Sequence, residues 1–206
     1  MSKIARQLQI YDRISGTPTL EEISFGVIIS PKEIMNGFGI SQRMLQRDLK
    51  DLRDCGLINV KYNKSRDMYI QVDNIVFDES AGERRKQHLR RLFRLGTLIS
   101  KLSCVYQSEI DHYESLVGEL NDYIEFSQED PETFPPEDIE EMRENVEAEY
   151  PYFPDLKSEY YTLCPDSNER TLQRDFKELR DAGFDIDYHR EYKTVIFLVD
   201  DVNTEY

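Results

Sequence analysis

The sequence predicts a mainly α-helical protein with small β-hairpins, an α+β fold built from two copies of one structural unit. A sixteen-residue segment at 41–56 recurs 127 residues later at 168–183, with ten identical positions. Apolar residues in each copy follow helical spacing, and a short β-pattern comes directly after each copy. A match this dense, with Leu-Gln-Arg-Asp intact in both copies, indicates a duplicated structural unit.

The first copy is preceded by two helical patterns, one over residues 3–14 and a shorter one over 31–38. Pro31 suits the first turn of the second pattern, where a helix needs no backbone N–H donor. The repeated segment itself starts at a good N-cap residue, Ser41 or Asn168, and ends at Gly56 or Gly183, which suit a C-terminal cap. Three consecutive helices are therefore predicted for the first copy.

Each repeated helix has one apolar and one basic face. At 100° per residue the apolar positions fall at i, i+4 and i+7, so they form a stripe that we expect to be buried. These positions are Leu45, Leu49 and Leu52 in the first copy and Leu172, Phe176 and Leu179 in the second. Asp48 and Asp175 lie at the edge of the stripe, and we expect each to pair with a basic group of its own unit.

A β-hairpin is predicted after each repeated helix, over 57–72 and 184–199. Polar and basic residues interrupt both runs, among them Lys64 and Arg66 in the first and Arg190 in the second. Three helices followed by a two-stranded ribbon with a basic tip form a winged helix-turn-helix. We therefore predict two such units, over residues 1–78 and 79–206.

The second unit is interrupted. Its first helix is predicted over 84–102, but its second, over 156–163, lies about 50 residues further on. An acidic helical insertion at about 104–155 separates them, with helices at 106–126 and 137–149 and a proline-containing loop at 129–136. No order is predicted for 127–136. Aromatic residues of the insertion suit either a protein interface or the second unit's own core.

The acidity of the chain is confined to one segment. The formal net charge is -15, but residues 107–166 hold 19 acidic and 2 basic residues, leaving 22 acidic and 24 basic residues elsewhere. Nucleic-acid binding is therefore not excluded outside that segment. Seven basic residues between Arg84 and Lys101 suit either phosphate contact or neutralisation of the insertion.

Other patterns exclude several classes of protein. The chain has no apolar run long enough for a membrane span or a secretory signal, which predicts a cytoplasmic location. Three cysteines without a paired spacing and three scattered histidines indicate neither disulfides nor a metal site, so the cysteines are interpreted as small core residues. No glycine-rich phosphate loop, nucleophile elbow or cysteine–histidine pair is present, so we predict no cofactor and no enzymatic activity.

The basic faces of the repeated helices are the candidate DNA-binding surface, because Arg recognises guanine and Gln recognises adenine in the major groove. The alternative is an ordinary solvated helix face. The candidates of the first unit are Ser41, Gln42, Arg43, Gln46, Arg47, Lys50, Lys64 and Arg66. Those of the second are Asn168, Arg170, Gln173, Arg174, Lys177 and Arg190. The second helix has Glu169 where the first has Gln42, and phosphate would repel this carboxylate. We therefore expect the first unit to be the better reader of DNA.

The run Ser-x-Arg-x-Leu-x-Arg-Asp-Leu-x-x-Leu-x-x-x-Gly at 41–56 resembles the recognition-helix region of bacterial DeoR-type regulators and of the winged-helix half of WYL-domain regulators. The second copy is similar to the same pattern, with Asn168 at the cap, whereas the first has Met44 where Thr is usual. The resemblance covers about 30 residues per copy. It implies a DNA-binding regulator, although the effector domain of these families is missing after Val199 and the acidic insertion is foreign to them.

The functional expectation is a bacterial or phage transcription regulator that binds specific double-stranded DNA as a homodimer, with the acidic insertion as a possible dimer contact. Two alternatives stay open. One is an acidic winged-helix scaffold that binds proteins, as in chromosome-condensation accessory subunits. The other is a plasmid-type replication initiator, because these also place two winged helices in tandem.

Overall fold

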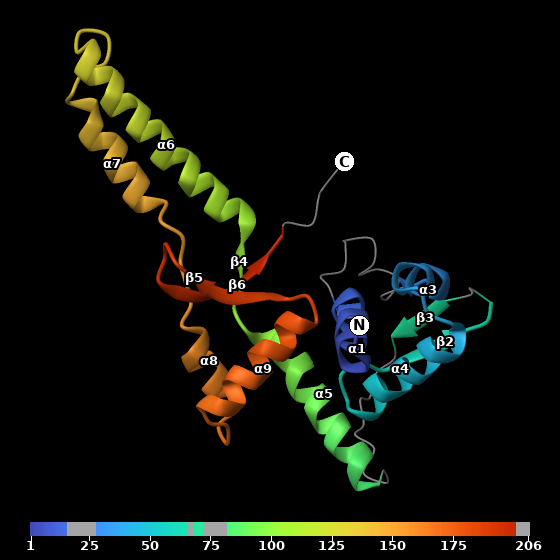
Figure 1. Cartoon of the computed structure of the whole chain (residues 1–206). Helices are drawn as coiled ribbons and strands as arrows, with labels where there is room; N and C mark the ends of the chain where they lie inside the picture. The colour runs from blue at the N-terminus through green and yellow to red at the C-terminus, as the bar shows by residue number, and fades with distance from the viewer. Residues whose placement is uncertain (16–27, 66–67, 72–81, 201–206) are drawn as a thin grey trace. The chain divides into compact units, whose positions relative to one another are not determined.

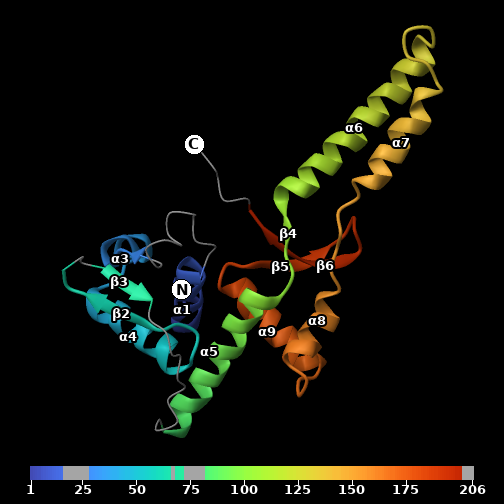
Figure 2. The same cartoon turned by 180° about the vertical axis from the view of Figure 1, so that it is seen from behind.

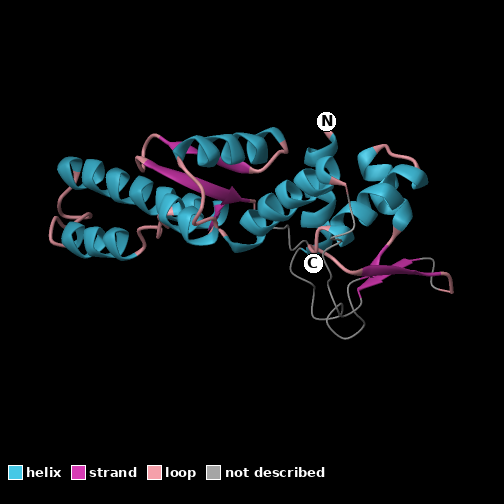
Figure 3. Cartoon of the chain, turned by 90° about the horizontal axis from the view of Figure 1, so that it is seen from below, coloured by secondary structure: helices cyan, strands magenta, loops and turns pink. Residues whose placement is uncertain are grey.

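The computed structural model describes residues 1–15, 28–65, 68–71 and 82–200. Over these residues the chain is mainly helical with small β-sheets, which confirms the predicted α+β class (Figure 3). The chain divides into two compact units. The helical unit comprises Met1–Leu102 and Lys157–Phe184, and the insertion unit comprises Ser103–Leu156 and Asp185–Tyr206.

The first half of the helical unit contains three helices, which we call the first bundle: α1 (Lys3–Ser15), α3 (Pro31–Phe38) and α4 (Gln42–Asp54). A sheet in the order β1-β3-β2 accompanies them, and its strands β2 and β3 are labelled in Figure 1. Its strands, β1 (Ile28–Ile29), β2 (Val60–Asn63) and β3 (Met68–Gln71), all pair antiparallel. The predicted helices and hairpin are confirmed here, and β1 is a third strand that the sequence pattern did not reveal.

The second bundle consists of α5 (Glu83–Lys101), α8 (Leu156–Leu163) and α9 (Glu169–Asp181). The helices α5 and α9 are joined by an ion pair between Arg94 and Asp175, and α8 and α9 by a hydrogen bond from Tyr160 to Asp175. Helix α1 also contacts α5 and α9, so the two bundles form one compact body. Both repeated segments are therefore third helices of three-helix bundles, and the prediction that these bundles are winged helix-turn-helix units stays a prediction.

Both repeated helices begin and end in the same way. Ser41 and Asn168 accept a hydrogen bond from the backbone N–H three residues on, and so cap the first turn. Gly56 and Gly183 follow the last turn with φ of 83° and 97°, a left-handed conformation that side chains with a Cβ disfavour. The paired hydrogen bonds Leu57 N–H to Leu52 C=O and Phe184 N–H to Leu179 C=O complete a Schellman motif at each end.

The six apolar stripe residues of α4 and α9 are all at most 5% exposed, which confirms their predicted burial. Apolar residues of the neighbouring helices, such as Leu8 of α1 and Leu95 of α5, are completely buried as well. Burying a leucine side chain stabilises a fold by about 1.5–3 kcal/mol. The orientation of each repeated helix is therefore set by its apolar face, and the basic face is directed away from the core.

The insertion unit contains a three-stranded sheet and a pair of helices. The sheet has the order β4-β6-β5, with β4 (Val105–Tyr106) parallel to β6 (Thr194–Val199) and β5 (Asp185–His189) antiparallel to it. The hairpin predicted over 184–199 is confirmed, and β4 is again an added third strand. Helices α6 (Gln107–Glu129) and α7 (Asp138–Ala148) lie side by side and run in opposite directions (Figure 2).

Helix α6 continues past the predicted end at Phe126 to Glu129, and residues 130–137 form an ordered turn. The sequence analysis predicted no order for residues 127–136. This prediction is wrong, because the structure has helix up to Glu129 and a turn after it. The reason is an aromatic contact: the ring of Phe134 lies 5.5 Å from that of Tyr123 and 5.3 Å from that of Phe126. Ser127, near the end of α6, is buried.

Aromatic residues of the insertion serve the unit's own core in part. Phe153 and Tyr192 pack against the core residues Val105, Ile110 and Ile196. Burial and nearby carboxylates raise the pKa of Tyr192 to about 12. Tyr152, by contrast, is 83% exposed. The sequence left two roles open for these aromatic residues. Core packing is confirmed for Phe153, whereas a protein interface formed by the exposed rings stays a prediction.

The compact units differ from the predicted division into 1–78 and 79–206. That boundary lies outside the described residues and stays a prediction, whereas the contacts group the second bundle with the first. The predicted insertion at about 104–155 coincides closely with Ser103–Leu156 of the insertion unit. Of the cysteines, Cys55 is a core residue as predicted, while Cys104 and Cys164 are half-buried.

Candidate nucleic-acid interface

The outer face of α4 has exposed amide and guanidinium groups within three turns of helix. The side chains of Gln42, Arg43, Gln46, Arg47 and Lys50 are all exposed, as is Ser41 at the cap. The side chains of Gln42, Arg43, Gln46, Arg47 and Lys50 form no hydrogen bond or ion pair with another residue of the described part of the chain, and that of Ser41 accepts only the capping hydrogen bond from Met44 N–H. The donors and acceptors of this face are therefore available to a ligand.

The inner face of α4 is held by charge as well as by apolar packing. Asp48 is 1% exposed and accepts a hydrogen bond from Arg6 Nε at 2.7 Å and one from Gln7 Nε2 at 3.1 Å. Asp51 is bound by Lys3 Nζ at 2.6 Å and by Arg85 Nη2 at 2.9 Å. A buried carboxylate needs such partners to offset its lost hydration. The prediction that Asp48 pairs inside its own unit is confirmed.

The pKa of Asp51 reflects two opposed effects. Burial alone would raise this pKa, but hydrogen bonds from Lys3 and Gln7, with the nearby charge of Arg85, outweigh burial and lower it. A carboxyl whose pKa is lower in the folded than in the unfolded state stabilises the fold above its unfolded pKa of about 3.9. This stabilisation is lost as the pH falls through the folded pKa, so α4 stays anchored at neutral pH.

Helix α9 repeats the geometry of α4, and its exposed face differs mainly at one position. Asn168, Arg170, Gln173, Arg174 and Lys177 are exposed. Buried Asp175 accepts hydrogen bonds from Arg94 Nη2 and Tyr160 Oη, each at 2.9 Å, which confirms its predicted pairing inside the second bundle. Glu178, one turn on, is bound by Arg91 Nε at 2.7 Å. The framework of the two helices is thus the same.

The difference is Glu169, which occupies the position of Gln42. Its carboxylate accepts hydrogen bonds from Lys157 Nζ at 2.8 Å, Gln173 Nε2 at 3.1 Å and Tyr161 Oη at 3.2 Å. Lys157 and then Gln173 are the main causes that lower the pKa of Glu169 to about 2, so it is charged at neutral pH. The amide of Gln173 is therefore engaged by a fixed negative charge.

The tips of the two hairpins carry the remaining candidate residues. Lys64 is exposed in the turn between β2 and β3, where the backbone N–H of Ser65 donates a hydrogen bond to the side-chain oxygen of Asn63. Arg66 lies outside the described residues. Arg190 is exposed in the turn between β5 and β6, which belongs to the insertion unit.

A small hollow borders the outer face of α4. It has a volume of about 210 Å³, and its lining residues come from α3, α4 and the β2–β3 hairpin: Pro31, Lys32, Met35, Gln42, Gln46, Tyr62 and Tyr69. Tyr62 is 43% exposed, and its ring lies 5.5 Å from that of Tyr69. Sequence reasoning missed Tyr62, although its place in a strand beside a basic turn was visible.

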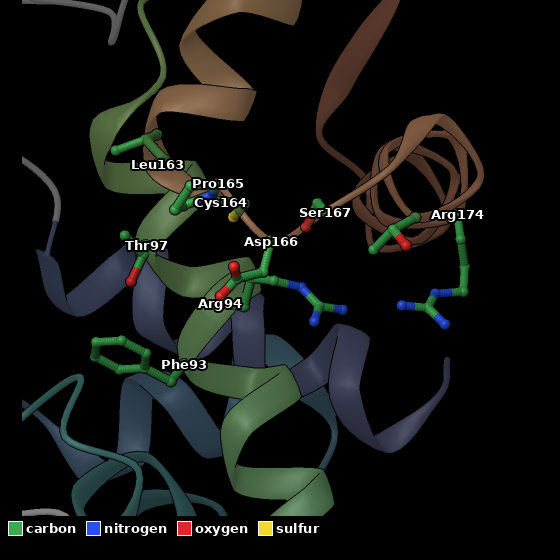
Figure 4. Close-up of a pocket in the computed structure, with 10 residues that line it drawn as sticks. Phe93, Arg94, Thr97, Leu163, Cys164, Pro165, Asp166, Ser167 and Arg174 are labelled. Atoms are coloured by element: carbon green, nitrogen blue, oxygen red, sulfur yellow. The ribbon is translucent and has the colours of Figure 1, made fainter.

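A larger cavity of about 490 Å³ lies in the second bundle, between α5 and the turn that joins α8 to α9 (Figure 4). The guanidinium groups of Arg94 and Arg174 point toward each other across it (Figure 4). Phe93, which is 46% exposed, and Leu163 add apolar lining. Asp175 lies within ion-pair distance of both arginines, and its single charge offsets one of the two positive charges.

Three arginines of the basic run in α5 form ion pairs with carboxylates of the repeated helices. Arg85 binds Asp51 and Asp54, Arg91 binds Glu178, and Arg94 binds Asp175. These arginines neutralise carboxylates of α4 and α9, a role that differs from both sequence-based interpretations. Arg84 and Arg90 are exposed and remain suited to phosphate contact.

Comparison with protein-family models, with curated proteins and with solved structures finds no match to this chain. Within the described residues, no cluster of His, Cys, Asp and Glu has the arrangement of a metal site. A search of the same residues finds no helix long and apolar enough to cross a membrane.

Proposed function

We propose that this chain is a sequence-specific DNA-binding transcription regulator with two tandem winged helix-turn-helix units. The observation that carries the proposal is the outer face of α4, where Gln42, Arg43, Gln46 and Arg47 are exposed and have no partner among the described residues, on a helix fixed from its inner side. The N-terminal residues of a recognition helix contact base edges, and rigid presentation keeps the entropic cost of binding low.

Charge and topology support the same function. Outside residues 107–166 the chain carries 24 basic and 22 acidic residues, so phosphate repels this part of the chain far less than the total net charge suggests. In chain order, a β-hairpin with a basic turn follows each third helix. The proposed site of action is the bacterial cytoplasm.

Selection from a pool of random duplex DNA tests this function. We expect repeated rounds with the intact chain to enrich one short motif, bound at least about a thousandfold more tightly than unrelated duplexes at physiological salt. Failure to enrich any motif, combined with retention of a protein partner, would favour the scaffold alternative. Enrichment of repeated sites from a replication origin would favour the initiator.

The proposal ranks α4 above α9 as the DNA-reading helix, and this ranking predicts how the affinity of α9 for DNA can be raised. The substitution Glu169→Gln gives α9 the residue that α4 has at the same place. It removes a carboxylate that phosphate repels and releases the amide of Gln173. We expect a few-fold rise in affinity for the selected DNA, measured by fluorescence anisotropy. Glu159→Gln, which changes the same charge in α8, is the matched control, and an equal rise there would show that only net charge matters.

A homodimer through the insertion is the proposed assembly. No residue of α7 is buried, and apolar side chains of α6 and α7 such as Leu116, Leu120 and Met142 remain half-exposed, which leaves a surface for a second copy. Light scattering should report a dimer for the intact chain and a monomer when residues 106–150 are replaced by a short linker. A single-chain mass for the intact protein would contradict it.

A further inference from the structure

The two bundles share more than the repeated helices. Arg6 and Arg94 bind Asp48 and Asp175 at 2.7 and 2.8 Å, respectively. Three residues earlier, Lys3 and Arg91 bind Asp51 and Glu178, at 2.6 and 2.7 Å. The contacts between α1 and α4 are therefore equivalent to those between α5 and α9. The equivalent residues of α1 and α5 are 88 positions apart, whereas those of α4 and α9 are 127 positions apart.

The contacts between the bundles are reciprocal. Gly96 of α5 lies so close to Leu57, just past the end of α4, that a Cβ at Gly96 would collide with the leucine side chain. In the other direction, Gln9 of α1 donates a hydrogen bond of 2.6 Å to the carbonyl of Ala182, just past the end of α9. Because Gly96 corresponds to Leu8, each repeated helix rests its C-terminal end on the same turn of the other bundle's first helix.

Reciprocal contact of equivalent surfaces is the property of a two-fold arrangement. Here both halves of the arrangement come from one chain and lie in one compact unit. In dimeric helix-turn-helix proteins, the two-fold axis of the protein coincides with that of an inverted repeat in the DNA. A single chain therefore has the internal symmetry that other regulators obtain by dimerisation.

We propose that one chain binds both halves of an imperfect inverted repeat in duplex DNA, with α4 on one half-site and α9 on the other. This proposal rests on the proposed function. Four basic or amide positions are the same in both helices: Arg43 and Arg170, Gln46 and Gln173, Arg47 and Arg174, and Lys50 and Lys177. We expect the two half-sites to have the same bases where these four residue pairs contact them. They should differ at the base that faces Gln42 in one half-site and Glu169 in the other.

The test uses the intact chain and four duplexes built from the selected motif: the inverted repeat, the same half-sites as a direct repeat, one half-site alone and a scrambled duplex. Affinity is measured by fluorescence anisotropy, and the number of chains per duplex by sedimentation velocity. We expect each chain to bind one whole inverted repeat, so that the proposed dimer carries two duplexes, and to bind it at least about tenfold more tightly than the direct repeat or the single half-site.

Two surface variants assign the half-sites. Arg170→Ala/Arg174→Ala should weaken binding of the inverted repeat but leave the single half-site unchanged, whereas Arg43→Ala/Arg47→Ala should weaken both. Circular dichroism checks that both variants fold. Equal affinity for inverted and direct repeats, or an inverted repeat shared by two chains even at saturating duplex, would overturn the proposal while leaving the function intact. Equal affinity for all four duplexes, the scrambled one included, would instead refute the proposed function.

Discussion

Replacement of Asp175 by Asn should destabilise the protein by about 3–5 kcal/mol, the usual cost of breaking a buried ion pair by removing one charge. Asp175 is completely buried and is the shared partner of Arg94 from α5 and Tyr160 from α8. The substitution keeps the shape of the side chain, so it removes the charge without opening a cavity. The guanidinium of Arg94, with a side chain 29% exposed, would then lose its main counter-charge.

Urea denaturation followed by circular dichroism measures this loss, provided that the transition stays two-state. Asp181→Asn at the exposed end of α9 is the matched control and should change the free energy of unfolding by less than about 0.5 kcal/mol. The double variant Arg94→Met/Asp175→Asn should lose less than the sum of the two single changes, because the residues interact directly. A loss below 1 kcal/mol for Asp175→Asn would show that this ion pair does not hold the second bundle together.

Local sequence signals predicted the elements of the fold well. The caps at Ser41 and Asn168, the glycines that end both helices and the apolar spacing are all short-range features, and the structure contains each of them. The predicted 31–38 and 156–163 helices match α3 and α8 residue for residue. Such features are fixed by neighbours within a few residues, which is why one sequence suffices to find them.

Contacts between distant segments could not be predicted in the same way. Arg6 and Asp48 are 42 residues apart, and nothing in either segment identifies the other as its partner. The equivalence of α1 and α5 was hidden because the ion-pairing residues Lys3 and Arg91 share charge but not identity. The two-residue strands β1 and β4 are too short to give an alternating pattern.

The candidate interface was predicted residue by residue, but the difference between its halves was only partly visible. The sequence showed that Glu169 replaces Gln42, and it predicted a poorer reader from charge alone. It did not show that Glu169 also engages Gln173 and Lys157, because Lys157 belongs to a different helix. The structure thus adds a second reason for the same ranking, and the ranking itself stays a prediction.

The central claim, that the outer face of α4 reads base sequence, is tested most directly by replacing Arg43 and Arg47 with Ala. Both side chains are exposed and unpaired within the described residues, so the fold should not change. Each contact of an arginine to a guanine edge contributes on the order of 1–3 kcal/mol of discrimination. The double substitution should therefore weaken binding to the selected DNA at least about thirtyfold and relax its sequence preference.

The measurement is fluorescence anisotropy on the selected and a scrambled duplex at several salt concentrations, with Arg143→Ala in α7 as the control for loss of an exposed arginine. The account predicts that the ratio of the two affinities falls sharply for Arg43→Ala/Arg47→Ala and stays unchanged for Arg143→Ala. A shallower salt dependence with an unchanged ratio would mean that the arginines contact only phosphate, and would contradict the claim that α4 reads the sequence.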